Sequence, residues 1–558
     1  MAFSINKALR SAQNHLISGQ ISEAEAIYKE ILTKFPKNKK AIQGYQKLKL
    51  GITSKIVKNT APPQVQMQEL SSLFHMGFMH EVISKTQLMV DLYPKSLELH
   101  ILLGEANRCL ENHQNAIKSY EKALEIKPNY AEIHNNMGNV LKQSKDLVEA
   151  INCYKKAIEF KPNYTDAYFN LANALHDQGE LEAAVGYFQQ TIKDLPRHAK
   201  AYFNMSVALH EMGDLDAAII GYEKALQLQP EYPEAWNNLG NSFRDRGDLA
   251  KAKESFRSAI RINPEYSTPY WNLSGTETQI SASKSWLKKC LEVDENYQHA
   301  YLMLAALDYY EGDQRHYLKI IHSDLYNHPF TRSFSWVFSL PSLPELYFNK
   351  WQFLESVVEQ SPQTRPFYEF GVWRGVSFEF LTKIFGKGYG FDTFEGLPES
   401  WHEEKVGTYS SNRKVPKIDG GEFIVGKFEE TLPDFFSVPR PMASVINFDA
   451  DLYTSTKCAL DQAQSVIDSE TILIFDEFLM NHRWEDDEFK ALEDFCAANL
   501  FTYIVLAVSF FSKQVAIRLL KQDFFIVFIK RDIVARPSIR TYSQRPRGIG
   551  ILANWLGA

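Results

Sequence analysis

Acidic residues and glycines stand close together in one stretch of the last third of the chain. An apolar run ends at Glu369, glycines follow at Gly371 and Gly375, and a further acid, Asp392, closes the next apolar run. Open α/β sheets hold nucleosides in this way, in the crevice at the carboxyl ends of their parallel strands, with glycines in the first turn. The stretch therefore predicts a site for a nucleoside-type cofactor.

The spacing within the turn indicates which nucleoside fits. A dinucleotide needs G-x-G-x-x-G, whose middle glycine lets the backbone approach the pyrophosphate, and here Trp373 takes that position. The sequence also lacks the G-x-x-x-x-G-K-[ST] phosphate loop of nucleotide triphosphatases. An acid that can face an ammonium group, Glu369, and one that can accept hydrogen bonds from ribose, Asp392, match the charges of S-adenosylmethionine instead.

Three further blocks follow in a fixed order, at residues 426–433, 447–456 and 474–478. Together with residues 390–398 they resemble the macrocin O-methyltransferase family of class I S-adenosylmethionine-dependent enzymes, over about residues 345–520. The resemblance implies methyl transfer to a hydroxyl. It also implies the cofactor-binding residues: Glu369, Gly371, Gly375 and Ser377 at the methionine end, Asp392 at the ribose, and Lys427 and Phe428 near the adenine.

The same resemblance implies a divalent metal, Mg²⁺, held by Asp449, Asp476 and Glu477 at the ends of two strands. Carboxylate oxygens are the ligands that this hard cation prefers, and a metal-bound hydroxyl is more acidic. Asp449 is then both a ligand and the general base. The family commonly has two aspartates where this chain has Asp476-Glu477, so full metal affinity stays open. Each acid by itself equally fits a helix cap or a surface ion pair.

Other side chains near these blocks have two interpretations each. Arg374 fits either the cofactor carboxylate or a surface ion pair, and residues 399–421 fit either a lid that excludes water or an ordinary loop. His402 and His482 are alternative acid–base candidates, and a structural role is the simpler interpretation of both. Trp484 resembles a family position beside the substrate pocket, with core packing as the alternative.

Alternating strand and helix patterns after about residue 331 predict the βαβ units that would position these residues. We expect a Rossmann-like class I methyltransferase domain over residues 331–530 and a basic tail over 531–558. The predicted strands are 367–370, 388–391, 423–425, 444–448 and 471–475, with closing strands at 503–510 and 524–529. The predicted helices are 377–385, 431–435, 455–468 and 486–498.

A 34-residue period fills the first half of the chain. Prolines recur without a slip from Pro94 to Pro264, and alanines and aromatic residues keep the same step. A fixed period of this length predicts a stack of two-helix units, with proline ending the second helix. The pattern resembles tetratricopeptide repeats, regular over about 97–264 and irregular at both ends of an array spanning 1–330. The expected fold class is therefore an α-solenoid followed by an α/β domain.

One repeat position carries asparagine in five successive units. A carboxamide both donates and accepts hydrogen bonds, so a column of them can hold an extended peptide backbone. The alternative is that these side chains satisfy polar groups between repeats. The predicted peptide-binding residues are Asn136, Asn170, Asn204, Asn238 and Asn272.

Composition excludes some classes of partner. A net charge of −7 argues against nucleic acid, because binding a phosphate backbone needs a positive surface. The five cysteines are scattered without metal-binding spacing, which is typical of reduced thiols. The sequence shows neither a signal-peptide core nor the roughly 20 apolar residues of a membrane span. We therefore expect a cytoplasmic protein without a membrane span, and homo-oligomerisation stays open.

Three hypotheses of function follow. The leading one is an O-methyltransferase that acts on a hydroxyl of a sugar or glycoconjugate, with the repeat array recruiting a protein or peptide partner. The second is an interaction scaffold whose methyltransferase-like domain is catalytically inactive. In the third, the array itself holds the acceptor that is methylated. The identities of the acceptor, the partner and the pathway do not follow from the sequence.

Overall fold

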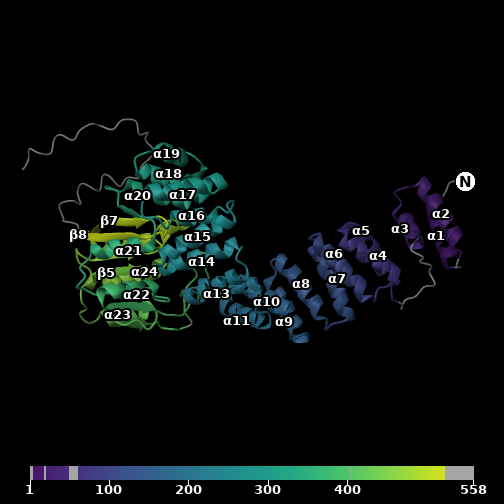
Figure 1. Cartoon of the computed structure of the whole chain (residues 1–558), viewed down its shortest axis with the longest axis horizontal. Helices are drawn as coiled ribbons and strands as arrows, with labels where there is room; N and C mark the ends of the chain where they lie inside the picture. Colours follow the sequence, from purple (N-terminus) through teal and green to yellow (C-terminus); the bar gives the residue numbers. More distant parts are fainter. Residues whose placement is uncertain (1–3, 18–19, 50–60, 403, 412, 522–558) are drawn as a thin grey trace, which may run out of the picture. The chain divides into compact units, whose positions relative to one another are not determined.

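The computed structural model describes residues 4–17, 20–49, 61–402, 404–411 and 413–521. The predicted strand 524–529 and the basic tail 531–558 lie outside these residues. The chain divides into two compact units, residues 1–239 and 240–558 (Figure 1). The division falls inside helix α14 (Pro233–Arg246), so the last helices of the array belong to the same unit as the sheet.

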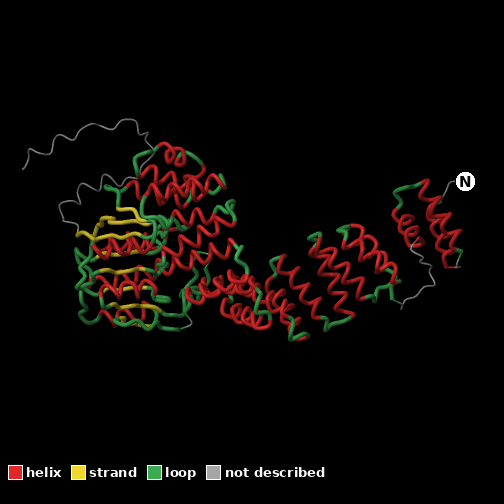
Figure 2. The backbone as a smooth tube through the Cα atoms, in the orientation of Figure 1, coloured by secondary structure: helices red, strands yellow, loops and turns green. Residues whose placement is uncertain are grey.

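The regular elements in the described part of the first unit are all helices (Figure 2). Its second helices end just before the repeated prolines, as the sequence predicts. Lys127, for example, follows the last helical residue with φ −135° and ψ 86°, because a residue before proline avoids the helical region. The helices are α1 (Ile5–Ile17), α2 (Ile21–Lys34), α3 (Lys39–Lys49), α4 (Gln64–His75), α5 (Met79–Val90), α6 (Leu97–Cys109), α7 (His113–Ile126), α8 (Ala131–Gln143), α9 (Leu147–Phe160), α10 (Thr165–Gln178), α11 (Leu181–Asp194), α12 (Ala199–Glu211) and α13 (Leu215–Leu228).

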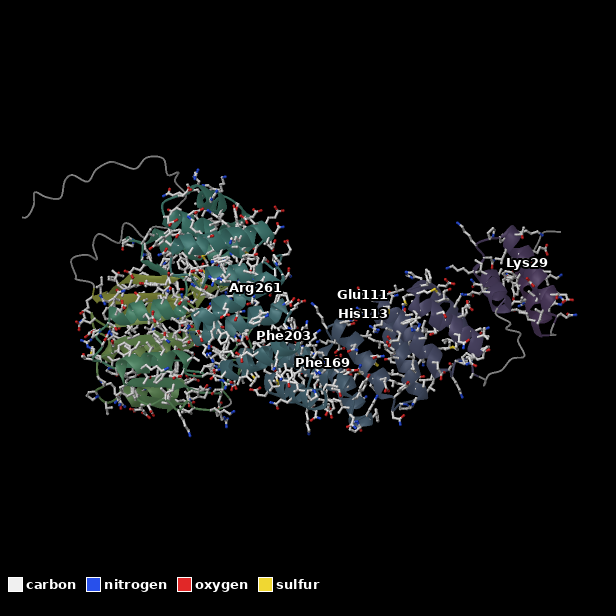
Figure 3. The ribbon with its side chains drawn as sticks, viewed as in Figure 1. Lys29, Glu111, His113, Phe169, Phe203 and Arg261 are labelled. Carbon is white, nitrogen blue, oxygen red and sulfur yellow. The ribbon has the colours of Figure 1, made fainter. Side chains whose placement is uncertain are left out.

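The periodic alanines and aromatic residues form the core of the array. Ala150 and Tyr154 are fully buried, as are their equivalents Ala184 and Phe188 in the next repeat. On the facing helices, Phe169 lies 5.9 Å from the Phe188 ring, and Phe203, one repeat later, lies 5.8 Å from the Tyr222 ring (Figure 3). Small residues let the paired helices approach, and the aromatic rings fill the space between them.

In the second unit the remaining helices pack directly against the sheet. Leu287, Met303 and Phe334 share one hydrophobic core with sheet-domain residues, and the Phe334 ring lies 4.8 Å from that of Phe510. The end of the 34-residue period near residue 330 is therefore not a boundary in the packing. These helices are α15 (Leu249–Ile262), α16 (Thr268–Ser274), α17 (Ile280–Val293), α18 (Gln298–Tyr310), α19 (Arg315–Ile321), the 3₁₀ turn η1 (Asp324–Asn327) and α20 (Pro329–Ser339).

The sheet has eight strands in the order β1-β7-β8-β6-β5-β2-β3-β4. Strands β6, β5, β2, β3 and β4 run parallel, whereas β8 is antiparallel to both β6 and β7. The sequence analysis did not assign β1 or β8. The elements are β1 (Glu345–Tyr347), α21 (Lys350–Glu359), β2 (Phe367–Phe370), α22 (Val376–Phe385), β3 (Gly388–Asp392), β4 (Gly421–Val425), α23 (Phe428–Phe436), β5 (Val445–Phe448), α24 (Tyr453–Ala463), η2 (Gln464–Val466), β6 (Ile472–Phe475), η3 (Trp484–Asp486), α25 (Glu488–Asn499), β7 (Phe501–Ser509) and β8 (Val515–Lys521).

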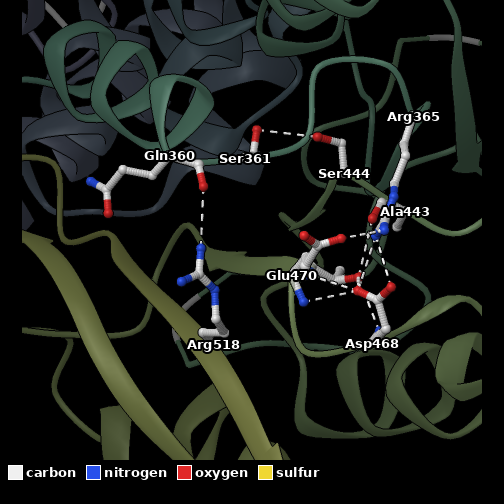
Figure 4. Close-up of polar contacts among 9 residues, drawn as sticks. Gln360, Ser361, Arg365, Ala443, Ser444, Asp468, Glu470 and Arg518 are labelled. Carbon is white, nitrogen blue, oxygen red and sulfur yellow. Dashed lines mark hydrogen bonds and ion pairs between the residues drawn. The ribbon is translucent and has the colours of Figure 1, made fainter.

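A polar network fastens the amino ends of the central strands (Figure 4). Arg365, just before β2, donates to both carboxylate oxygens of Asp468 at 3.0 and 2.9 Å and to Glu470 at 2.5 Å. Nearby, the Ser444 hydroxyl donates to that of Ser361 at 3.1 Å. These contacts tie the segments before β2, β5 and β6 together, and the opposite, carboxyl ends carry the predicted site.

Candidate functional site

The order of the strands switches between β2 and β5. The next strand in the chain, β3, pairs with β2 on one side, and β5 pairs with β2 on the other. Open α/β sheets bind their ligands at the carboxyl ends of the strands beside such a switch in strand order. The predicted acids lie at the carboxyl ends of four strands. Glu369 and Asp392 are among the last residues of β2 and β3, and Asp449 and Asp476 directly follow β5 and β6. The fold thus brings residues from four separate sequence blocks to one edge.

The turn after β2 needs glycine for steric reasons. Gly371 has φ +88°, and a Cβ at this position would lie 1.8 Å from the carbonyl oxygen of Asp449. Gly375 has φ +77° and precedes the first residue of α22. Trp373 adopts φ +47° without being glycine, and its ring meets Tyr409 edge-on at 5.8 Å. The turn therefore lies against the strand end that carries Asp449.

Asp392 holds this turn in place. Its Oδ2 accepts the backbone N–H groups of Val372 at 2.8 Å and Trp373 at 2.7 Å, and its Oδ1 accepts that of Phe394 at 2.6 Å. A carboxylate has about four lone-pair sites, so three bonds leave roughly one for a ligand. The structure thus gives Asp392 a role in shaping the turn, and contact with a ribose stays a prediction.

Glu369 is a fully buried carboxyl group with one unused oxygen. Its Oε1 accepts a hydrogen bond from the Ser377 hydroxyl at 2.8 Å, and its Oε2 has no partner among the described residues. Burial raises the pKa of Glu369 to about 8. An unpartnered buried carboxyl oxygen beside a glycine turn fits a cationic ligand group such as an ammonium.

The raised pKa of Glu369 predicts a pH-dependent stability. Between its ordinary value of 4.5 and about 8, the native protein binds a proton that the unfolded chain has lost, so the free energy of unfolding falls as pH rises. One such group contributes at most about 1.4 kcal/mol per pH unit. Glu369→Gln should reduce the slope of the free energy of unfolding against pH by up to this amount. The measurement is urea unfolding of the sheet-containing unit at a series of pH values. Equal slopes for the two proteins would contradict the assignment.

The acids after β5 and β6 share a lysine that the sequence analysis did not single out. The Lys350 ammonium lies 3.1 and 3.2 Å from the two carboxylate oxygens of Asp476 and 3.9 Å from Asp449 Oδ2. Gln514 donates a further hydrogen bond to Asp476. Burial and the neighbouring Asp476 raise the pKa of Asp449 to about 8. Its side chain is still 31% exposed, so solvent and small molecules can reach it.

Glu477 has its own lysine. Lys513 Nζ lies 2.8 Å from Glu477 Oε2, and Asn481 Nδ2 donates to the same oxygen at 2.8 Å. Within the described part of the chain, no group of three or more His, Cys, Asp or Glu side chains is arranged to hold a metal ion. Lys350 and Lys513 neutralise the carboxylates of Asp449, Asp476 and Glu477 instead, so these groups do not fit a Mg²⁺ site in this arrangement.

Two more buried acids lie near the site and were not assigned from the sequence. Asp451 is 9% exposed and Glu488 is 1% exposed, and neither oxygen of Glu488 has a partner among the described residues. Burial raises the pKa of both carboxyl groups. The spacing of Asp451 from Asp449 could have suggested it, whereas Glu488 and Lys350 belong to no recognisable motif.

The remaining sequence candidates are placed as follows. His402 Nε2 contacts Asp487 at 2.8 Å, and the backbone carbonyl of His482 accepts from Arg332. Trp484 is buried, with its ring 5.0 Å from that of Phe489, as core packing requires.

In the loop 399–421, Trp401 packs with Leu397 and Leu452 in a small cluster. Lys427 is exposed at the start of α23, and the next residue, Phe428, meets the Phe370 ring edge-on at 5.7 Å. The buried Nε of Arg374 has no partner among the described residues.

The repeat asparagines bridge successive units. Asn136 Nδ2 donates to Glu105 at 2.6 Å, Asn170 Nδ2 to Asn135 at 3.0 Å, and Asn204 Nδ2 to Asn173 at 2.5 Å. The acceptor in each case lies in the preceding repeat. These bonds favour the interpretation that the side chains link repeats, and peptide binding by them, including Asn238 and Asn272, stays a prediction.

Models of repeat families match the helical part of the chain. A TPR repeat model matches residues 104–145, 138–179 and 207–243, and tetratricopeptide repeat models match 167–200 and 233–266. The chain carries tetratricopeptide repeats. No curated protein matches the chain in sequence. All of these matches lie before the sheet, so the methyltransferase interpretation of residues 345–520 stays a proposal.

Solved structures of repeat proteins are also similar. MamA is 24% identical, with 31% of this chain and 94% of MamA covered and a TM-score of 0.29. YrrB, a TPR protein with an unusual peptide-binding site, is 21% identical, with 33% of this chain and 95% of YrrB covered and a TM-score of 0.30. The C-terminal part of a TPR repeat-containing protein from Cytophaga hutchinsonii is 15% identical, with 42% of this chain and 97% of that structure covered and a TM-score of 0.37. These scores are too low to support an inference about function.

None of the helices in the described ranges has the length and apolar character needed to cross a bilayer. Tetratricopeptide repeats bind protein or peptide partners, and residues 104–266 carry such repeats.

Proposed function

We propose that the α/β part of the chain is an S-adenosylmethionine-dependent O-methyltransferase that acts on a hydroxyl of a sugar or glycoconjugate, while the repeats recruit a protein partner. One observation carries the proposal. A glycine turn and the buried Glu369, with its unused oxygen, lie at the carboxyl end of β2, beside Asp449 at the end of β5. This arrangement supports a cationic cofactor next to a general base.

The residues around the turn are suited to hold the methionine end of the cofactor. Glu369 offers its free oxygen to the ammonium group, and Ser377 fixes the orientation of that carboxyl group. Gly371 and Gly375 keep side chains out of the turn. When bound, S-adenosylmethionine supplies an electrophilic methyl group on a sulfonium sulfur.

Asp449 is suited to act as the general base. Its pKa of about 8 lies near neutral pH, where a base both exists in its ionised form and takes a proton readily. With the cofactor bound, Asp449 would accept the proton of the acceptor hydroxyl and so make its oxygen a better nucleophile for the methyl group. Because the carboxylates do not fit a Mg²⁺ site, we assign no step to a metal ion.

Calorimetric titration of the full chain tests this proposal. We expect S-adenosylmethionine to bind with a Kd between about 1 µM and 1 mM, and NAD⁺, titrated as a control, not to bind because Trp373 replaces the glycine that a pyrophosphate needs. Absence of binding at about 1 mM would reject the methyltransferase proposal.

The inactive scaffold remains the second candidate. It is favoured by Asp392, whose carboxylate is largely taken up by three backbone N–H groups. Cofactor binding, together with no methyl uptake by any of a panel of sugars and glycoconjugates, would favour this scaffold over the enzyme.

A further inference from the structure

A lysine occupies the position between the two acids that the family resemblance assigns to a metal. Lys350 Nζ contacts both oxygens of Asp476, at 3.1 and 3.2 Å, and lies 3.9 Å from Asp449 Oδ2. The two acids follow neighbouring parallel strands, β5 and β6, whose last residues Phe448 and Phe475 are paired. The ammonium group therefore lies where one cation can contact both.

The helix that carries Lys350 makes this contact unusual. Lys350 is the first residue of α21, and Asn349 caps the helix by accepting the N–H of Gln352 at 3.0 Å. A cation at a helix N-terminus is opposed by the helix dipole. The position is thus favourable for lysine only because Asp476 and Asp449 compensate its charge. Of its side chain, 28% is exposed, so the contact is not sealed from small ions.

The third predicted ligand is also neutralised from within the chain. Lys513 contacts Glu477 Oε2 at 2.8 Å and Asn481 Oδ1 at 2.9 Å. Lysine and a divalent ion compete for the same carboxylate oxygens, so both cannot occupy the position that contacts Asp449 and Asp476.

We propose that Lys350 is a resident cation that takes the place of the divalent metal between Asp449 and Asp476, so that this chain does not bind Mg²⁺ there. The proposal deepens the proposed function, on which its consequence for methyl transfer rests. In that reaction Lys350 is a positioning residue: it orients Asp476 and holds positive charge beside the base, Asp449. Its positive charge also favours the ionised form of a neighbouring acceptor oxygen.

Metal titration of the full chain tests the proposal without relying on enzymatic activity. Mn²⁺ binding is followed by electron paramagnetic resonance, with calorimetry for Mg²⁺. We expect no saturable binding to the wild type up to about 1 mM, the weak end of protein sites for hard cations. Lys350→Met, which removes the charge and keeps an unbranched side chain only one atom shorter, is expected to bind one Mn²⁺ per chain. Adding Asp449→Asn to this variant should abolish that binding.

Control variants separate the role of the charge from that of folding. Lys350→Arg keeps a cation and should stay free of metal, and Lys383→Met removes an exposed lysine of α22 that pairs with Glu379 and should behave as wild type. Circular dichroism and thermal unfolding establish that each variant is folded, and Lys350→Ala replaces the methionine variant if that one is not.

Two results would overturn the proposal. One is stoichiometric Mn²⁺ binding to the wild type that Asp449→Asn removes. The other is a folded Lys350→Met or Lys350→Ala protein that still binds no ion, since the lysine would then not be what fills the position. Failure of S-adenosylmethionine to bind would reject the methyltransferase but leave these metal results standing, so the two failures are distinguishable.

Discussion

Replacing Asp449 with asparagine should lower kcat for methyl transfer by about 10²- to 10⁴-fold, the usual contribution of a positioned general base. The amide keeps the shape of the side chain but cannot take the acceptor proton. Because the pKa of Asp449 is raised to about 8, wild-type kcat should increase with pH up to about 8 and then level off. The measurement is methyl uptake from labelled S-adenosylmethionine across this pH range.

The affinity for S-adenosylmethionine should change little in Asp449→Asn, since the proposed ammonium contact belongs to Glu369. Asp461→Asn serves as the matched control, because Asp461 is a 45% exposed aspartate of α24 that pairs with Lys457. If Asp449→Asn turns over as fast as the wild type, Asp449 is not the base.

Replacing Gly371 with alanine should cost the α/β unit more than about 3 kcal/mol of stability and abolish cofactor binding. The new Cβ would lie 1.8 Å from the carbonyl oxygen of Asp449, where only backbone can move, and φ is +88°. The turn and the end of β5 would have to separate. The measurements are thermal unfolding of the full chain and calorimetric titration with S-adenosylmethionine.

Gly386 offers a matched comparison within the same domain. It ends α22 with φ +71°, and a Cβ added there would meet nothing within 4 Å. Gly386→Ala should therefore cost only the left-handed backbone penalty, about 1–2 kcal/mol, and leave cofactor binding intact. Equal losses in the two variants would show that the close approach of Gly371 to Asp449 does not matter.

The sequence predicted most of the parallel sheet because its strands are buried on both faces. Strands β2, β3, β5 and β6 are buried throughout apart from Asp392, and such strands read as short apolar runs between turn residues. The repeats were equally predictable from the sequence, because stacking similar units requires the same residue types at a fixed period. Local signals were sufficient in both cases.

The closing part of the sheet was not predictable in the same way. Strand β8 (Val515–Lys521) lies between β6 and β7, antiparallel to both, and its partners are chosen by position in the sheet. Strand preference depends on neighbouring strands more than on the strand's own residues, and the turn before β8 lacks a strong hairpin signal. The sequence analysis therefore placed the last closing strand at 524–529, which lies outside the described residues.

For the candidate site, the sequence by itself determined the acids and the glycine turn. Residue type limits what Glu369 or Asp449 can do, and glycine marks a backbone that other residues cannot adopt. Only the tertiary structure decided which groups face these acids: Lys350 on a separate helix, Lys513 in the turn between β7 and β8, and the N–H groups that donate to Asp392. Charge pairing depends on distance in space, which sequence spacing does not encode across separate elements.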